Sequence, residues 1–306
     1  MKAETFTASD GHAVFYYRWL PDQQPRAVIH IAHGMGEHAA RYDWTASRLV
    51  QAGFAVIADD HRGHGKTAET LGQFGEDGWN RTIADLREMI ASYDQTFPGL
   101  PKILFGHSMG AMLTQQYIEL HGDSLHAAIL SGSPGFSGLL PTWILQLIVR
   151  FERWRLGANA ESPLLAAMVF GSANKPFEAQ YASPTGFEWL SRDAAQVQAY
   201  VNDPACGFVP CTGSLFDLFQ GASWTSKTTS VARIPRDLPV LVFSGTDDPV
   251  HSEMKDINRL LKKYRDHGLQ VDTQFYEGGR HEMLNETNRE QVIDDVIRWL
   301  DLKLMT

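Results

Sequence analysis

A short apolar run that ends in Gly-x-Ser-x-Gly constrains this chain more than any other feature of its sequence. The motif is Gly106-His-Ser-Met-Gly110. A strand that turns sharply into a helix around such a serine exposes the hydroxyl to substrate. A turn signal at Pro98-Gly-Leu-Pro101 precedes the run, and apolar residues at helical spacing follow it as far as His121. This context predicts a strand, a turn and a helix, with Ser108 as a candidate nucleophile.

A serine nucleophile needs a base, and the base needs an acid that fixes its tautomer. A serine on such a strand-to-helix turn is called a nucleophile elbow. In folds built around it, the three catalytic residues follow one another along the chain in the order Ser, Asp, His. An apolar run at 240–243 is followed by Asp247 and Asp248, and a strand-like run at 271–276 is followed by His281 in a Gly-rich loop. The residues predict His281 as the base and leave the acid open between Asp247 and Asp248.

The reaction also needs an oxyanion hole, which two backbone N–H groups usually form. One group is expected at Met109, directly after the nucleophile. The other is expected in His33-Gly-Met-Gly-Glu-His38, where glycines surround Met35 after an apolar run at 29–32.

Strand-like and helix-like runs alternate at both ends of the chain, a pattern typical of a mostly parallel sheet covered by helices. About eight strands are expected, at 5–8, 13–19, 27–32, 55–58, 103–105, 127–130, 240–243 and 271–276. The first two form a hairpin, and a terminal helix covers 285–304. We expect an α/β core of residues 1–134 and 234–306, with a helical cap inserted over 135–233.

One helix of the expected cap has a broad apolar face, because apolar residues recur there at steps of three and four. This stripe consists of Ile144, Leu147, Ile148, Phe151 and Trp154. Core packing and a lid above the active site both fit such a stripe. With Trp143 added, our hypothesis is that part of it lines an acyl pocket or contacts lipid aggregates.

The composition excludes several classes of function. The chain has 306 residues and a formal net charge of −9, and it lacks a basic stripe that would neutralise nucleic-acid phosphates. It has no membrane-spanning apolar run and no secretory signal pattern at its N-terminus, so we expect a cytoplasmic protein. The two cysteines, Cys206 and Cys211, are expected to be free thiols.

Two motifs imitate other sites. Gly65-Lys-Thr67 resembles the end of a phosphate-binding loop, but Asp60 stands where that loop needs a glycine. The histidines at 33, 38, 61 and 64 do not have the spacing of a known zinc motif and are expected to form hydrogen bonds in loops around the site. We therefore expect neither a metal nor an organic cofactor.

The motifs taken together resemble the α/β-hydrolase superfamily and, within it, the monoacylglycerol lipase and lysophospholipase group. The matching segments are His33-Gly-Met-Gly-Glu-His38 with Arg41-Tyr42, Asp60-His-Arg-Gly-His-Gly65, Gly106-His-Ser-Met-Gly110, Gly245-Thr-Asp-Asp248 and Arg280-His-Glu-Met-Leu-Asn-Glu286. In that group the acid lies three residues after the glycine, which selects Asp248.

The resemblance implies an α/β-hydrolase fold, with Ser108 as nucleophile, His281 as base, Asp248 as acid, and the amides of Met35 and Met109 as the oxyanion hole. It implies a serine hydrolase that cleaves a carboxylic ester of a single acyl chain and needs no cofactor. The partners expected are a small acyl ester and, through the cap, transient contact with membrane or lipid aggregates. A serine peptidase or amidase, a small-ester carboxylesterase, and a ligand-binding protein without turnover are the alternatives.

Overall fold

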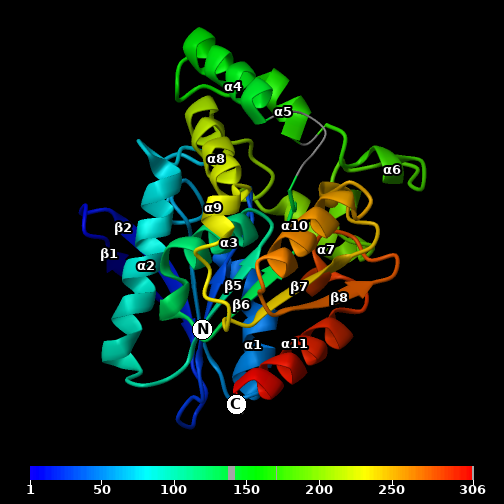
Figure 1. The fold of residues 1–306 in the computed structure, drawn as a ribbon. Helices are drawn as coiled ribbons and strands as arrows, with labels where there is room; N and C mark the ends of the chain where they lie inside the picture. Colours follow the sequence, from blue (N-terminus) through cyan, green and yellow to red (C-terminus); the bar gives the residue numbers. More distant parts are fainter. Residues whose placement is uncertain (137–141, 170, 305–306) are drawn as a thin grey trace.

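A computed structural model describes residues 1–136, 142–169 and 171–304 of the chain, and its centre is one sheet of eight strands (Figure 1). In chain order the strands are β1 Lys2–Thr7, β2 Ala13–Trp19, β3 Val28–Ala32, β4 Ala55–Asp59, β5 Lys102–His107, β6 Ala127–Ser131, β7 Val240–Gly245 and β8 Val271–Tyr276. In the sheet their order is β1-β2-β4-β3-β5-β6-β7-β8.

The sheet is antiparallel at one edge and parallel elsewhere. The β1–β2 and β2–β4 pairs are antiparallel, and every pair from β4 to β8 is parallel. Strands β3, β4 and β6 are buried along their whole length because helices cover both faces, as parallel sheets require. The carboxyl ends of β3, β5, β7 and β8 therefore meet at one edge, where α/β sheets place their sites.

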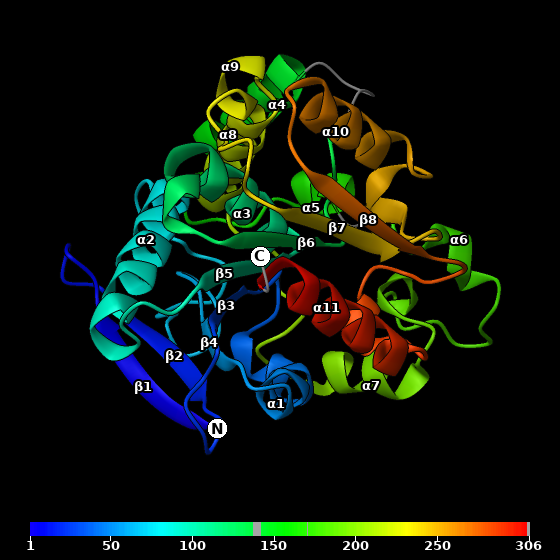
Figure 2. The same cartoon turned by 60° about the horizontal axis from the view of Figure 1, so that its bottom comes forward.

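Two hydrophobic cores lie on opposite faces of the sheet (Figure 2). One is formed with α1 Asp43–Gln51 and α11 Arg289–Leu304. The other is formed with α2 Gly78–Thr96, α3 Met109–His121 and α10 Lys255–Asp266. The α/β-hydrolase architecture expected from the sequence is confirmed.

The chain between β6 and β7 contains helices joined by loops and no strand among its described residues. Its helices are α4 Thr142–Leu156, α5 Pro163–Val169, α6 Lys175–Glu178, α7 Ala194–Asn202, α8 Thr212–Thr225 and α9 Thr228–Val231. Figure 1 shows α4, α5 and α8 stacked at one end of the molecule, away from α11. Within the described residues, no helix combines the length and the apolar character needed to cross a membrane.

One of the two alternatives for the apolar stripe on α4 does not fit the structure, because none of its described residues lines the large cavity of the candidate site. The side chains of Leu147, Phe151 and Trp154 are 56%, 54% and 80% exposed. The α4 residue that lines the large cavity described below is Leu145, which the stripe did not include. The side chain of Trp143 lies outside the described part of the structure.

A buried carboxyl group lies between α3, α8 and α10. Glu119 is 2% exposed, and neither of its carboxylate oxygens has a hydrogen-bond partner among the described residues. The indole N–H of Trp224 and the hydroxyl of Tyr264 also lack partners there. Burial raises the pKa of Glu119 to about 9, although the positive charge of Lys263 opposes this effect. Glu119 is therefore protonated at neutral pH.

We expect Glu119→Gln to stabilise the fold at alkaline pH. Because the pKa of Glu119 is higher in the folded than in the unfolded chain, the folded state binds more protons and stability falls as pH rises from about 4.5 to about 9. Glutamine does not ionise, so the free energy of unfolding should rise by a few kcal/mol at pH 8 and change little at pH 4.5. Urea unfolding at the two pH values measures this, and an equal change at both would contradict it.

Candidate active site

The site begins at the turn between β5 and α3. Ser108 occupies this turn with φ 53° and ψ −114°, a conformation that non-glycine residues rarely adopt. Its backbone N–H donates to the Ser131 carbonyl oxygen at 2.9 Å, which ties the turn to β6. Strained residues of this kind persist only where the surrounding structure holds them in place, and they concentrate at functional sites.

The two glycines of the motif are required because neighbouring backbone leaves no room for a side chain at either position. A Cβ at Gly106 would lie 2.2 Å from the carbonyl oxygen of Gly110, and a Cβ at Gly110 would lie 1.9 Å from that of Ala32. Strand β5, helix α3 and the end of β3 therefore approach so closely that no side chain fits between them. This packing brings Ser108 next to the loop that follows β3.

The structure brings His281 and Asp248 together from the loops after β8 and β7. His281 Nδ1 lies 2.9 Å from Asp248 Oδ2, and both residues are buried. Asp248 also accepts hydrogen bonds from the Ser244 hydroxyl at Oδ2 and from the Val250 N–H at Oδ1. Asp247 is exposed instead, so it is Asp248 that meets the imidazole.

The charges around His281 favour its use as a base. Burial disfavours the protonated imidazole, but the negative charge of Asp248 and its hydrogen bond outweigh burial and raise the pKa of His281. The His107 ring lies 4.8 Å from the His281 ring, between centroids. Burial lowers the pKa of His107 to about 4, so this neighbour is neutral at pH 7 and adds no repelling charge.

The loop after β3 has a fixed backbone around Met35. Burial holds the pKa of His33 well below its ordinary value, so the ring is neutral. Its Nε2 accepts from the His61 N–H at 3.0 Å, so its Nδ1 carries the proton and donates to the Gly34 carbonyl oxygen at 2.7 Å. Because the next peptide bond is trans and planar, the Met35 N–H must point away from that oxygen.

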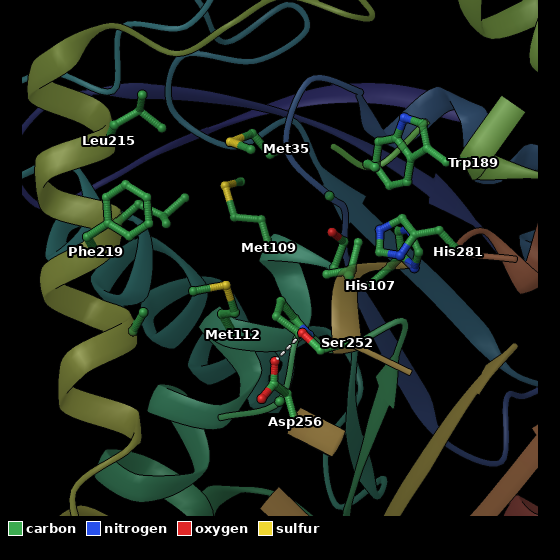
Figure 3. Close-up of a pocket in the computed structure, with 18 of the residues that line it drawn as sticks. Met35, His107, Met109, Met112, Trp189, Leu215, Phe219, Ser252, Asp256 and His281 are labelled. Carbon is green, nitrogen blue, oxygen red and sulfur yellow. Dashed lines mark hydrogen bonds between the residues drawn. The ribbon is translucent and has the colours of Figure 1, made fainter. Parts of the chain in front are cut away.

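One cavity of about 440 Å³ is lined by Ser108, His281, Met35 and Met109. Figure 3 shows His281 and His107 on one side, Leu215 and Phe219 on the opposite side, and three methionines between them. Most of the wall is apolar, as is usual for pockets that bind small molecules. The cavity thus combines a serine and a histidine with room for an apolar chain.

A buried ion-pair network links the Met35 loop to the His281 loop. Arg41 donates to both carboxylate oxygens of Glu282, at 2.8 and 2.7 Å, and to Glu37 at 2.5 Å. Glu37 in turn accepts the Gly34 N–H at 2.6 Å. Arg41 therefore positions the backbone on both sides of the cavity. The sequence motifs contained Glu37 and Arg41 but did not indicate this connection.

Residues of the helical segment 135–233 complete the wall. Trp189 stacks near His281 with 4.9 Å between ring centroids, and its carbonyl oxygen accepts the His281 N–H at 3.3 Å. Tyr200 lines the cavity from α7 and donates to the Gly36 carbonyl oxygen at 2.8 Å. Neither residue was predicted as part of the site, because side-chain periodicity does not tell which helix face meets the site.

The chain is similar to lipases and esterases over almost its full length. It is 27% identical to the monoacylglycerol lipase of Mycolicibacterium smegmatis, over 97% of this chain and 95% of that protein. It is 28% identical to the human monoglyceride lipase, over 97% and 90%. Among solved structures, a thermostable carboxyl esterase from Bacillus coagulans in complex with glycerol matches with a TM-score of 0.90 and 27% identity, over 99% and 98% of the two chains.

The family match covers most of the fold described above. Residues 23–288 match the family described as serine aminopeptidase, S33, a range that includes the elbow, the Met35 loop and both loops that carry Asp248 and His281. The resemblance inferred from the motifs is confirmed. The chain belongs to the serine aminopeptidase S33 family of α/β-hydrolases.

Proposed function

We propose that this protein is a serine hydrolase that cleaves the carboxylic ester of a single acyl chain. The observation that carries the proposal is the hydrogen bond of 2.9 Å that holds His281 against Asp248 in the apolar cavity lined by Ser108. The relatives named monoacylglycerol lipase and the carboxyl esterase structure support ester substrates. The apolar wall supports an acyl group.

The proposed reaction has two halves. Ser108 Oγ forms a bond to the ester carbonyl carbon while His281 Nε2 takes its proton, and the Met35 and Met109 amides bind the oxyanion. When the intermediate collapses, the bond to the alkoxy oxygen breaks and the alcohol leaves with the proton from His281. Water then attacks the acyl-enzyme by the same route and releases the carboxylic acid. Asp248 keeps the His281 proton on Nδ1 and stabilises the imidazolium.

We propose that residues 135–233 act as a cap over the remaining core, residues 1–134 and 234–306. The segment supplies cavity residues from several of its helices, including Leu145, Trp189, Tyr200, Leu215 and Phe219. It also bonds to loops of the core through the Tyr200 hydroxyl and the Trp189 carbonyl oxygen. Substrate selection would then depend chiefly on this segment.

Labelling with a fluorophosphonate, followed by assays on two substrate classes, tests the proposed activity. We expect the probe to label Ser108, and the protein to hydrolyse p-nitrophenyl esters without releasing amine from aminoacyl-naphthylamides. Faster turnover of the naphthylamides would instead identify a peptidase, in line with the family description. Labelling without turnover of either class would favour a ligand-binding protein.

Medium-chain monoacyl esters should exceed acetate esters in kcat/KM. Each methylene buried in the apolar part of the cavity contributes about 0.8 kcal/mol, so a few carbons should raise kcat/KM by one or two orders of magnitude. Triacylglycerols should be poor substrates because a cavity of about 440 Å³ has too little room for three acyl chains. A chain-length series below each substrate's aggregation concentration measures this, and an optimum at acetate would contradict it.

A pair of variants separates cavity filling from general damage. Ala222 lines the cavity from α8, so Ala222→Phe should reduce turnover of octanoate esters more than that of acetate esters. Ala199 is exposed on α7, and Ala199→Phe should leave the ratio of the two rates unchanged.

We also propose that the exposed face of α4 contacts lipid aggregates through Leu147, Phe151 and Trp154. Burying two aromatic side chains contributes several kcal/mol to association with an apolar phase. The double variant Phe151→Ser, Trp154→Ser should lower the fraction bound to phosphatidylcholine vesicles at least about tenfold, with unchanged hydrolysis of a soluble ester. Leu302 is exposed on α11, away from α4, so Leu302→Ser serves as the control. An equal loss of the vesicle-bound fraction in the control and in the double variant would contradict the contact.

A further inference from the structure

Three side chains with metal-binding chemistry meet outside the cavity. They are His38, Asp203 and Cys206, and their ligand atoms all lie within 4.8 Å of one another. His38 Nε2 lies 2.9 Å from Asp203 Oδ2, and all three residues are partly buried. Among the described residues, no other group of His, Cys, Asp and Glu has this spacing. None of the three lines the cavity that contains Ser108.

Two separate segments form this cluster. His38 belongs to the loop after β3, and Asp203 directly follows α7. A tight turn places the two cap ligands side by side: the Cys206 N–H donates to the Asp203 carbonyl oxygen at 3.0 Å, and the Ala205 N–H donates to Asp203 Oδ1 at 2.9 Å. A separation of two residues between ligands is also common in short zinc-binding turns.

The two segments are held together independently of the cluster. The Gly36 carbonyl oxygen accepts two hydrogen bonds from the cap, from the Gly207 N–H at 2.9 Å and from the Tyr200 hydroxyl at 2.8 Å. The ligand set is therefore largely preformed, and little chain ordering would oppose the binding of an ion.

The local charge favours a divalent cation. Three carboxyl groups, those of Asp203, Glu37 and Glu282, and one guanidinium, that of Arg41, lie close enough to act on Cys206, so acidic groups outnumber basic ones around the cluster. Arg41 is engaged by Glu37 and Glu282 and stacks on the Tyr200 ring at 4.7 Å, so it does not occupy the cluster.

We propose that His38, Asp203 and Cys206 bind Zn²⁺ or a similar divalent transition metal, with water as the fourth ligand. Imidazole, carboxylate and thiolate form the ligand set that zinc prefers, whereas magnesium and calcium prefer oxygen alone. Tetrahedral zinc needs ligand atoms about 3.3 to 3.9 Å apart, so small side-chain rotations bring the set to this spacing. On binding, the Cys206 thiol loses its proton to solvent and the His38 proton moves from Nε2 to Nδ1.

A metal at this position would join the cap to the loop that carries Met35. Because the two ligand segments lie 165 residues apart in the chain, only the folded protein presents the site. An ion that binds the folded state alone raises the melting temperature, and the rise grows with the logarithm of the free ion concentration above the dissociation constant. The long separation also explains why no zinc motif is visible in the sequence.

Titration of the full chain with Co²⁺, after treatment with a chelator, tests this site. We expect one equivalent of cobalt to produce the near-ultraviolet charge-transfer band of a thiolate ligand, and Zn²⁺ to displace it. The band should vanish in Cys206→Ser and persist in Cys211→Ser, which changes the other cysteine, buried near Ser214. In His281→Gln the band should also persist, which separates this site from the cavity.

Calorimetry with Zn²⁺ provides a second measurement on the same proteins. Loss of a residue that merely supports a metal ligand weakens metal binding about tenfold or more, and loss of a ligand itself should weaken it at least as much. We therefore expect the dissociation constant for Zn²⁺ to rise at least about tenfold in Cys206→Ser and in Asp203→Asn. The melting temperature should rise with Zn²⁺ in the wild type, in Cys211→Ser and in His281→Gln, and much less in Cys206→Ser and Asp203→Asn. Absence of the cobalt band in the wild type, or a zinc affinity in Cys206→Ser and Asp203→Asn equal to that of the wild type, would overturn the proposal.

Discussion

Ser108→Ala should lower ester hydrolysis by a factor of about 10⁴ to 10⁶ without unfolding the protein. The variant removes the only atom that forms a bond to the acyl group in the proposed mechanism, while the cavity and both amides remain. The residual rate then comes from the oxyanion hole and from substrate binding alone. Single-turnover release of p-nitrophenol, with circular dichroism on the same sample, measures both activity and fold.

A control serine and a second substitution strengthen this experiment. Ser226 lines the same cavity, and Ser226→Ala should keep kcat within about tenfold of the wild type. Because Ser108 has a positive φ, Ser108→Gly should melt at a higher temperature than Ser108→Ala while being equally inactive. Turnover close to the wild type in purified Ser108→Ala would refute the mechanism.

Most strands were predictable because parallel strands buried on both faces appear as continuous apolar runs. The run at β3 was placed almost to the residue. The bounds of β8 were also correct, although this edge strand is mostly only partly buried and its sequence is not a continuous apolar run. At β5 the apolar run was shorter than the strand, because polar Lys102 and His107 continue the backbone pairing with β3 and β6. Side-chain hydrophobicity cannot show where such pairing ends.

The residues of the proposed site that were predicted from the sequence differ from the others in how they reach the cavity. Ser108, Asp248 and His281 each follow a strand, so their order in the chain indicates their place at one edge of the sheet. Trp189 and Tyr200 come from the helical segment, where periodicity predicts a face but not its partner. For the same reason the stripe on α4 was identified without Leu145, which lines the cavity.

The pairing of charged residues could not be predicted from the sequence for a further reason. Arg41 meets Glu282 across 241 residues of chain, and a sequence does not display which of many acids will neutralise a given arginine. The His38 to Asp203 contact is equally remote. Motif matching finds residues that are close in the chain, whereas the electrostatics of this site depend on residues brought together by the fold.

Asp248→Asn should lower kcat by about 10⁴ because the asparagine would hold His281 in the wrong tautomer. In the structure the Val250 N–H donates to Oδ1 and cannot rotate, whereas the Ser244 hydroxyl at Oδ2 can turn to accept. The amide NH₂ must therefore occupy the Oδ2 position, where it donates to His281 Nδ1. The imidazole proton then moves to Nε2, which can no longer accept the proton of Ser108.

The adjacent acid and the pH profile make this prediction specific. Asp247 is exposed, and Asp247→Asn should reduce kcat by less than about tenfold, because its carboxylate contacts Thr246 and not His281. Asp248→Asn also removes the charge that raises the pKa of His281, so the acidic limb of kcat/KM should move to lower pH. Residual activity of Asp248→Asn, measured with a soluble p-nitrophenyl ester across the acidic range, reports this shift. If Asp247→Asn were the more damaging variant, or if the limb did not move, the acid would not be Asp248, whatever the fate of Ser108→Ala.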